Sequence, residues 1–308
     1  MIKYRIIIVI ILTLFISCNN IPKVEEGYIH LNDTSIYYKT IGQGEPLIVL
    51  HGGPGFDHQT LMPYIGALGK EMKVVLYDQR GSGLSTGPID SDSITIDAFI
   101  EDIELIRKQI GVEKINLAGV SWGGVLALFY GVKYPDKLNS LILFSTAASA
   151  EMLFKTFPAL NKKRTSEDAA LMNVLSISDG YKNNDPKVLE EFYSIYCKAQ
   201  LADQSLVSKI NIVINENTAK NMDAINNFIW AAIGNFDLHN QLEKIGCPTL
   251  IMHGRQDPMP IEAAEKINEK LPNSELVIFE DSGHWIYLEE EEKFKSIVID
   301  FIEKVSNN

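Results

Sequence analysis

The stretch of sequence that decides the fold reads Ile115-Asn116-Leu117-Ala118-Gly119-Val120-Ser121-Trp122-Gly123-Gly124-Val125-Leu126-Ala127-Leu128-Phe129-Tyr130. Its first four residues predict a buried β-strand, and the apolar run after Gly124 predicts a helix. The pentapeptide between them has the pattern G-x-S-x-G, which places a serine on a sharp, strained turn from strand to helix. The glycines leave room where side chains beside Ser121 would not fit. The turn also puts Ser121 at a helix N-terminus, whose dipole favours developing negative charge.

A serine hydroxyl becomes a good nucleophile only when a neighbouring base removes its proton. His284 follows the last predicted strand in the loop Asp281-Ser282-Gly283-His284-Trp285, and it is the candidate base. Asp257 follows the preceding predicted strand and is the candidate acid that orients the imidazole. Asp281 is the competing acid, but it precedes the histidine on the same loop, so we interpret it as a turn or surface residue. The chain order Ser121, Asp257, His284 therefore predicts a catalytic triad.

A glycine-rich segment, His51-Gly52-Gly53-Pro54-Gly55, follows the third predicted strand. It is typical of a tight turn. It also offers the backbone N–H of Gly53, which together with that of Trp122 is predicted to bind the oxyanion of a tetrahedral intermediate. Each donor of this kind contributes roughly 10²–10³ in rate. We expect His51 to brace this loop rather than to act as a base.

Strand and helix patterns alternate on both sides of the Ser121 turn. Tyr28 to Leu31 and Ser35 to Thr40 predict an antiparallel pair, and Ile96 to Ile110 carries an apolar stripe at helical spacing. Short continuous apolar runs are typical of parallel strands that are covered by helices on both faces. The pattern predicts an α/β fold with a mostly parallel eight-stranded sheet flanked by helices. The six parallel-type runs are Pro46 to Leu50, Val74 to Tyr77, Ile115 to Ala118, Leu141 to Phe144, Thr249 to Met252 and Leu276 to Phe279.

Residues 147–240 break this alternation. The segment holds only two glycines, and its apolar residues recur at helical spacing. It predicts a helical cap inserted after the sixth strand, between two parts of an α/β core at residues 25–146 and 241–308. Aromatic side chains of the cap are mostly expected in its core, with some facing the active site; they are Phe154, Phe157, Phe192, Tyr193, Tyr196, Phe228 and Trp230.

The N-terminus has a different composition from the rest of the chain. Lys3 and Arg5 precede an apolar run, Ile6 to Ile16, that is shorter than the ~20 residues of a spanning helix and fits a signal peptide. Phe15-Ile16-Ser17-Cys18 resembles the lipobox of bacterial lipoproteins, where the cysteine is acylated. We expect a signal peptide at residues 1–17, a lipid on Cys18, a tether at 18–24 and a place in the bacterial cell envelope; a secreted or periplasmic protein and an uncleaved anchor are the alternatives.

Charge and cysteine content exclude other classes of function. The formal net charge of −12 disfavours nucleic acid, which needs clustered Lys and Arg. Apart from Cys18 the chain has Cys197 and Cys247, neither of which has Cys or His neighbours at zinc-ligand spacing. We expect no metal and no cofactor, and the pairing of the two cysteines stays open.

Four motifs together resemble the proline iminopeptidase group of the α/β hydrolases. They are His51 to Gly55, Asp78-Gln79-Arg80-Gly81-Ser82-Gly83-Leu84-Ser85, Gly119 to Gly124 and Gly254-Arg255-Gln256-Asp257. The resemblance covers the core on both sides of the cap and implies the α/β-hydrolase fold. In that family the Asp-Gln-Arg-Gly segment shapes the loop beside the active site.

Two parts of the sequence differ from the pattern of that family, the turn around Ser121 and the cap. The family's elbow usually reads Gly-Gly-Ser-Trp-Gly-Ser, whereas this chain has Val120 and Gly124. The cap matches poorly, and there family members hold acidic residues that bind the free amine of the substrate. Glu216 is the best candidate for that role, and a solvated glutamate at a helix end is the alternative.

The resemblance implies a serine hydrolase that works through an acyl-enzyme without a metal or an organic cofactor. Its substrate would be a small peptide from which an N-terminal proline or similar residue is released. A hydrolase of carboxylic esters, lactones or carbon–carbon bonds is the alternative, because such enzymes share this core and differ in the lid. A surface-tethered binding protein with an inactive site is the distant alternative.

Overall fold

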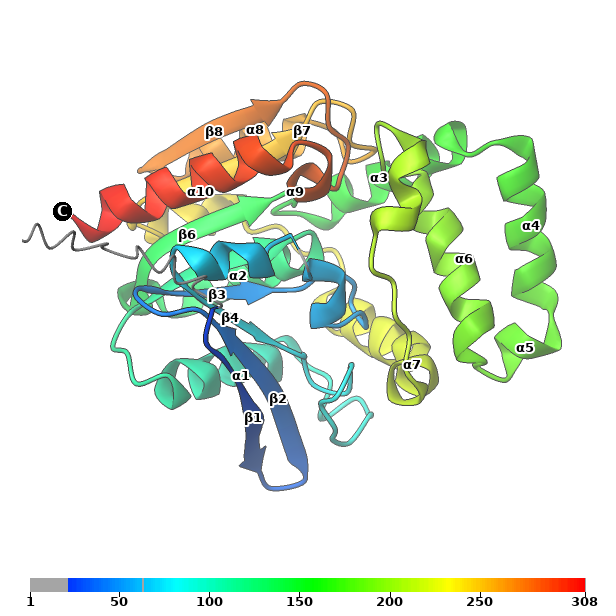
Figure 1. The fold of residues 1–308 in the computed structure, drawn as a ribbon, viewed down its shortest axis with the longest axis horizontal. Helices are drawn as coiled ribbons and strands as arrows, with labels where there is room; N and C mark the ends of the chain where they lie inside the picture. The colour runs from blue at the N-terminus through cyan, green and yellow to red at the C-terminus, as the bar shows by residue number, and fades with distance from the viewer. Residues whose placement is uncertain (1–21, 63, 308) are drawn as a thin grey trace, which may run out of the picture.

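The centre of the molecule is an eight-stranded sheet (Figure 1). The computed structural model describes residues 22–62 and 64–307, so the predicted signal peptide and Cys18 lie outside the described residues. The strands lie in the order β1-β2-β4-β3-β5-β6-β7-β8. Their bounds are β1 (Val24–Leu31), β2 (Thr34–Ile41), β3 (Pro46–Leu50), β4 (Lys73–Tyr77), β5 (Ile115–Val120), β6 (Leu138–Phe144), β7 (Thr249–Gly254) and β8 (Ser274–Phe279).

Only the first strands run antiparallel. β1 pairs with β2 through Leu31 and Thr34, across a turn in which Asn32 takes a φ of 50°, and β2 pairs antiparallel with β4. Every other neighbouring pair is parallel. The α/β fold class, with a mostly parallel eight-stranded sheet, is therefore confirmed. The largest differences from the sequence prediction are the starts of two strands: β1 begins at Val24 rather than Tyr28, and β6 begins at Leu138 rather than Leu141.

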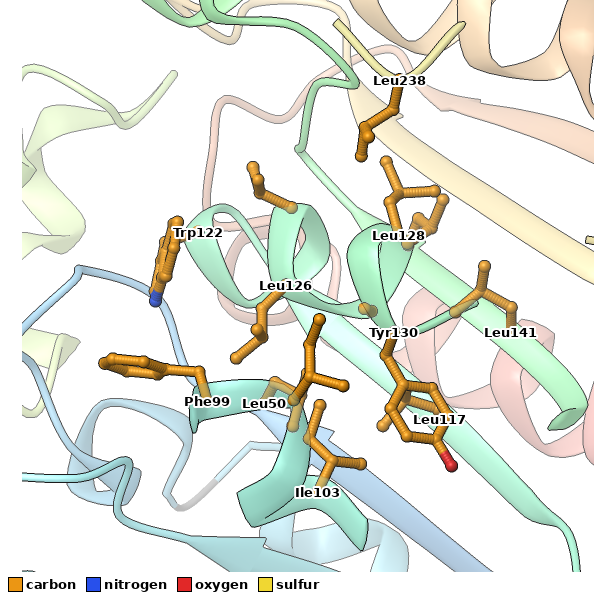
Figure 2. Packing of buried hydrophobic residues seen from close by; sticks show 14 of the residues in the cluster. Leu50, Phe99, Ile103, Leu117, Trp122, Leu126, Leu128, Tyr130, Leu141 and Leu238 are labelled. Carbon is orange, nitrogen blue, oxygen red and sulfur yellow. The ribbon is translucent and has the colours of Figure 1, made fainter. Parts of the chain in front are cut away.

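Helices cover both faces of the sheet. Alternate residues of one strand point to opposite faces, so Ile48 and Leu50 join the cluster beneath α1 (Ile96–Gln109), α2 (Trp122–Lys133) and α8 (Glu262–Lys270). Leu47 and Val49 join the cluster beneath α10 (Glu291–Ser306). Figure 2 shows side chains of the first cluster; its labelled residues include Phe99 and Ile103 of α1, Leu126, Leu128 and Tyr130 of α2, and Leu50 and Leu117 of the strands.

The helical cap is inserted between β6 and β7, as the sequence predicts. Local capping sets its helix starts: Asp185 accepts the N–H of Lys187, and Asn215 accepts that of Thr218. In Figure 1 the parallel strands point their carboxyl ends toward these helices. The cap helices are α3 (Ala150–Lys163), α4 (Ser166–Ile177), α5 (Asp179–Lys182), α6 (Pro186–Lys198) and α7 (Glu216–Ile233).

Short helical turns complete the structure. They are η1 (His58–Leu61), η2 (Gly66–Lys70), η3 (Pro135–Lys137), η4 (Gln204–Lys209), η5 (His239–Lys244) and α9 (Ile286–Glu289). Among the helices of residues 22–62 and 64–307, none combines the length and the apolar character that crossing a bilayer requires.

Candidate active site

Ser121 lies on the turn between β5 and α2. Its backbone has φ 54° and ψ −117°, a conformation that side-chain-bearing residues rarely adopt. Two hydrogen bonds to its backbone hold it there: its N–H donates to Phe144 O (2.9 Å) and its carbonyl accepts from Thr146 Oγ1 (2.7 Å). The side chain itself lines a cavity between core and cap. The neighbouring strand β6 thus supports the strained turn that presents Ser121.

Two glycines of the turn are required by close approaches. A Cβ on Gly123 would lie 2.3 Å from Leu50 O, which is far inside contact distance. A Cβ on Gly124 would lie 2.5 Å from Thr146 Cβ. The glycine at position 124, where the resembling family usually has serine, therefore complements Thr146, which fills that space and binds the Ser121 carbonyl.

His284 and Asp257 meet at the carboxyl ends of β7 and β8. His284 Nδ1 lies 2.8 Å from Asp257 Oδ2, and the backbone N–H of His284 donates to Gln200 O (2.9 Å). Burial raises the pKa of Asp257, but the charge and hydrogen bond of His284, together with His253 and the N–H of Met259, outweigh it and hold the pKa below its usual value. An ionised Asp257 keeps the proton on Nδ1, so that Nε2 can act as a base. Asp281 is exposed to solvent.

Two adjoining cavities meet at this site. The smaller, about 60 Å³, is lined by Gly53, Ser121 and His284 together with Phe56, Thr60, Val120, Tyr196, Gln200, Trp285, Tyr287 and Gly52. The larger, about 640 Å³, opens between the same three residues and the cap. Of the seven aromatic side chains singled out in the cap, six line the larger cavity, whereas Phe228 packs against the core.

Gln79 connects the two segments that carry the candidate oxyanion donors. The backbone N–H of Gln79 donates to His51 Nε2 (3.0 Å), and its side-chain Nε2 donates to His51 O (2.9 Å). Its Oε1 accepts from Trp122 Nε1 (2.8 Å). Burial lowers the pKa of His51 to about 4, so the imidazole is neutral near pH 7 and can accept the Gln79 N–H. Gln79 thus ties the loop that carries Gly53 to the first residue of α2.

The sequence profile of the α/β hydrolase fold family matches residues 45–291. The chain belongs to this family. The hydrolase is 33% identical to the proline iminopeptidase of Saccharolobus solfataricus over 291 residues, which cover 92% of this chain and 93% of the relative. The resemblance to proline iminopeptidases is therefore confirmed, and the protein is a serine hydrolase.

Solved structures agree with this assignment of the fold. The hydrolase is similar to a proline iminopeptidase from Mycobacterium smegmatis, with a TM-score of 0.68 and 24% identity over 91% of this chain and 98% of that one. It is also similar to an esterase from Exiguobacterium antarcticum, with a TM-score of 0.64 and 26% identity over 90% and 98% of the two chains. The same core thus carries proteins named for different substrates.

The two side-chain hydrogen bonds of Gln79 are expected to support catalysis. Gln79→Met keeps the side-chain volume but removes both bonds, so the buried Trp122 Nε1 loses its acceptor. We expect kcat to fall roughly 10-fold or more, since each oxyanion donor can contribute 10²–10³ and the change only loosens them. Stability should fall by about 1–3 kcal/mol. Steady-state kinetics and thermal unfolding check this, and Gln256→Met, at an exposed glutamine, is the control. An unchanged kcat in Gln79→Met would contradict the prediction.

Asp57, His58 and Asp78 form a buried cluster near the His51–Gly55 segment. One potential metal-ligand atom of each residue lies within 4.8 Å of those of the other two. Asp78 accepts from the backbone and Nδ1 of His58 and from the N–H of Leu84. Burial, followed by the charge of Asp78, raises the pKa of Asp57 to about 7. The oxygen atoms of Asp78 already have hydrogen-bond donors, so we assign the cluster a structural role under the Asp78–Ser85 segment rather than a metal site.

Glu216 lies away from both cavities, contrary to the role that the resemblance implied for it. It is the first residue of α7 and its side chain is exposed. Its neighbours Asn215 and Asn217 donate to Gly83 O and fix this end of the helix against the core. Asn226, the first residue of α7 to line the larger cavity, comes ten residues later, which is about 15 Å along the helix axis. The predicted role of Glu216 in binding the substrate amine is therefore wrong, and Glu216 is a solvated residue at a helix end.

Three residues of the site were not anticipated from the sequence. Thr146 follows β6 and could have been found because the carboxyl ends of adjacent parallel strands meet at one edge of the sheet. Gln200, which accepts from Trp285 Nε1, and Arg164, which follows α3, both line the larger cavity. They belong to the cap and stand in no motif, so the sequence offers no signal for them.

Proposed function

We propose that the hydrolase forms an acyl-enzyme on Ser121 and is an aminopeptidase that releases an N-terminal residue, such as proline, from small peptides. The observation that carries the proposal is the 33% identity to a proline iminopeptidase along almost the whole chain, in a protein whose Ser121 and His284 line one cavity.

The reaction follows from the positions of the groups. His284 Nε2 takes the proton of Ser121 as Oγ attacks the carbonyl carbon, and the N–H groups of Gly53 and Trp122 donate to the oxyanion. His284 then gives the proton to the leaving amine, and a water molecule resolves the acyl-enzyme. Asp257 stabilises the imidazolium formed in between. The small aromatic-walled recess beside Ser121 suits an acyl group of the size of proline.

A second candidate function, the hydrolysis of carboxylic esters, is favoured by the lining of the cavities. Among the described residues that line them there is no aspartate or glutamate. A peptide's α-ammonium would therefore meet only neutral acceptors, whereas an ester needs no ionic partner. The similarity to the Exiguobacterium antarcticum esterase is consistent with such an activity.

A substrate panel separates the two candidates. We expect prolyl and alanyl p-nitroanilides with a free amine to be hydrolysed with a burst of p-nitroaniline equal to the enzyme concentration when deacylation is slow. N-acetylprolyl p-nitroanilide should be a poor substrate. Turnover of p-nitrophenyl butyrate without turnover of any free-amine anilide would instead select the ester hydrolase.

We also propose that the enzyme is a lipoprotein of the bacterial cell envelope, with a small substrate reaching it outside the cytoplasm. Support comes from Lys3, Arg5, the apolar run that follows and Cys18. Expressed in a bacterium, the protein should partition with membranes and carry lipid at Cys18, and Cys18→Ser should abolish both. A cytosolic protein that begins at Met1 would contradict the proposal; secretion without lipid would select the alternative.

A further inference from the structure

Arg164, just after the end of α3, has no anionic partner among the described residues. Its Nη1 donates to Asn161 Oδ1 (2.7 Å), while its Nε–H is buried and has no acceptor in the described part of the chain. Two neighbouring cations are engaged: Lys198 pairs with Asp168 (2.7 Å), and Lys163 donates to the carbonyls of Leu201 and Gln256. Arg164 is the cap cation that keeps an unpartnered, buried N–H among the described residues.

The position of Arg164 connects it to the catalytic serine. It lines the larger cavity together with Ser121 and His284. Its Cζ lies 5.8 Å from the ring centroid of Tyr196, and Tyr196 lines the smaller cavity as well, beside Ser121. The guanidinium is thus one aromatic ring away from the recess at the nucleophile. The apolar lining of the cavity makes its charge act more strongly than it would in water.

We propose that Arg164 binds a carboxylate of the substrate. A guanidinium presents parallel N–H donors that match the two oxygens of a carboxylate, and here Nη2 makes no hydrogen bond to a described residue. The described cavity lining contains no acidic side chain that would compete for it. The same charge repels an α-ammonium, which directs the amino end of a peptide away from α3.

The inference rests on the proposed acyl-enzyme at Ser121 and defines the substrate class further. In an aminopeptidase the carboxylate would be the C-terminus of the leaving group, so dipeptides would be preferred over longer or amidated peptides. In an ester hydrolase it would belong to the acyl group, as in a half-ester of a dicarboxylic acid. Both sources share one chemistry, and two substrate pairs distinguish them.

The test compares each charged substrate with its neutral counterpart. The peptide pair is prolyl-alanine and prolyl-alaninamide; the ester pair is mono-p-nitrophenyl glutarate and p-nitrophenyl valerate. We expect the wild-type enzyme to favour the charged member of at least one pair. Arg164→Gln should lower that kcat/KM ratio roughly 10- to 100-fold, the effect of losing a charge-assisted hydrogen bond, with Arg164→Lys intermediate.

A matched control removes the same charge from the same helix. Lys162 is exposed and outside both cavities, so Lys162→Gln should leave the ratio unchanged. Equal losses on all four substrates in Arg164→Gln would assign Arg164 to cap structure alone, and an unchanged ratio in both pairs would also overturn the proposal. Turnover of the esters without the peptides would reject the aminopeptidase while the ester pair still tests Arg164.

A binding measurement does not depend on the choice of substrate. Glutarate should slow the labelling of Ser121 by a fluorophosphonate in the wild-type enzyme, and at least tenfold more glutarate should be needed in Arg164→Gln. Butyramide, which is uncharged, should act equally on both proteins. If glutarate protects neither protein, or both alike, Arg164 does not bind the carboxylate.

Discussion

Ser121→Ala is expected to lower kcat by about 10⁴–10⁶-fold, because the nucleophile of a serine hydrolase cannot be replaced by the other groups of the triad. The fold should be retained. The hydrogen bonds that support the turn use the backbone N–H and carbonyl of Ser121, and alanine keeps both. Circular dichroism and thermal unfolding check the fold, while turnover and fluorophosphonate labelling check the nucleophile.

Ser145 provides a matched control for this variant. It also follows a parallel strand, is buried and has a positive φ of 45°, and its Oγ has no hydrogen-bond partner among the described residues. Ser145→Ala should therefore leave labelling and turnover close to those of the wild-type enzyme. Acyl-enzyme formation that persists in Ser121→Ala would show that another residue is the nucleophile.

Asp257→Asn is expected to lower kcat by about 10³–10⁴-fold with little change in KM. An asparagine amide can donate to Nδ1, which favours the tautomer with the proton on Nε2 and removes the base that Ser121 needs. The variant also lacks the negative charge that stabilises the imidazolium in the 2.8 Å contact. Steady-state kinetics on the best substrate of the panel measure the loss.

Asp281→Asn is the control, because Asp281 is an exposed carboxylate on the same loop as His284. It should have wild-type activity. Comparable losses in both variants would mean that the negative charge near the loop, rather than the contact between Asp257 and His284, supports catalysis. Activity retained in Asp257→Asn would reject the candidate triad.

Local sequence patterns were enough to predict most of the core. The strand–turn–helix around Ser121 follows from a short strand pattern with three apolar residues, a G-x-S-x-G turn and a helical run, all within sixteen positions. The positions of His284 and Asp257 follow from the strands that precede them, since the carboxyl ends of parallel strands share one edge of a sheet. Each of these signals depends on neighbours along the chain or on a general rule of sheet topology.

The sequence does not show which residues of the cap face the active site. The helical character of the cap and its position between β6 and β7 are visible in the sequence, but the part of each helix that reaches the active site is not. Glu216 was chosen from its place in the chain, yet it is exposed in the first turn of α7, while Asn226 and Trp230 of the same helix line the cavity. Trp230 follows Glu216 by nearly four whole turns, so the two residues lie on similar faces but about 21 Å apart along the axis, and only the placement of α7 over the core decides which turns reach the cavity near Ser121.

The sequence by itself determined the fold class, the order of the strands along the chain and the candidate triad, because these depend on short-range periodicity and on chain order. Only the tertiary structure placed Gln79 between His51 and Trp122, Thr146 beneath Ser121, and Arg164 beside Tyr196. Those contacts join segments from different strands and cap helices, and they form only when the hydrophobic faces of the segments have packed together.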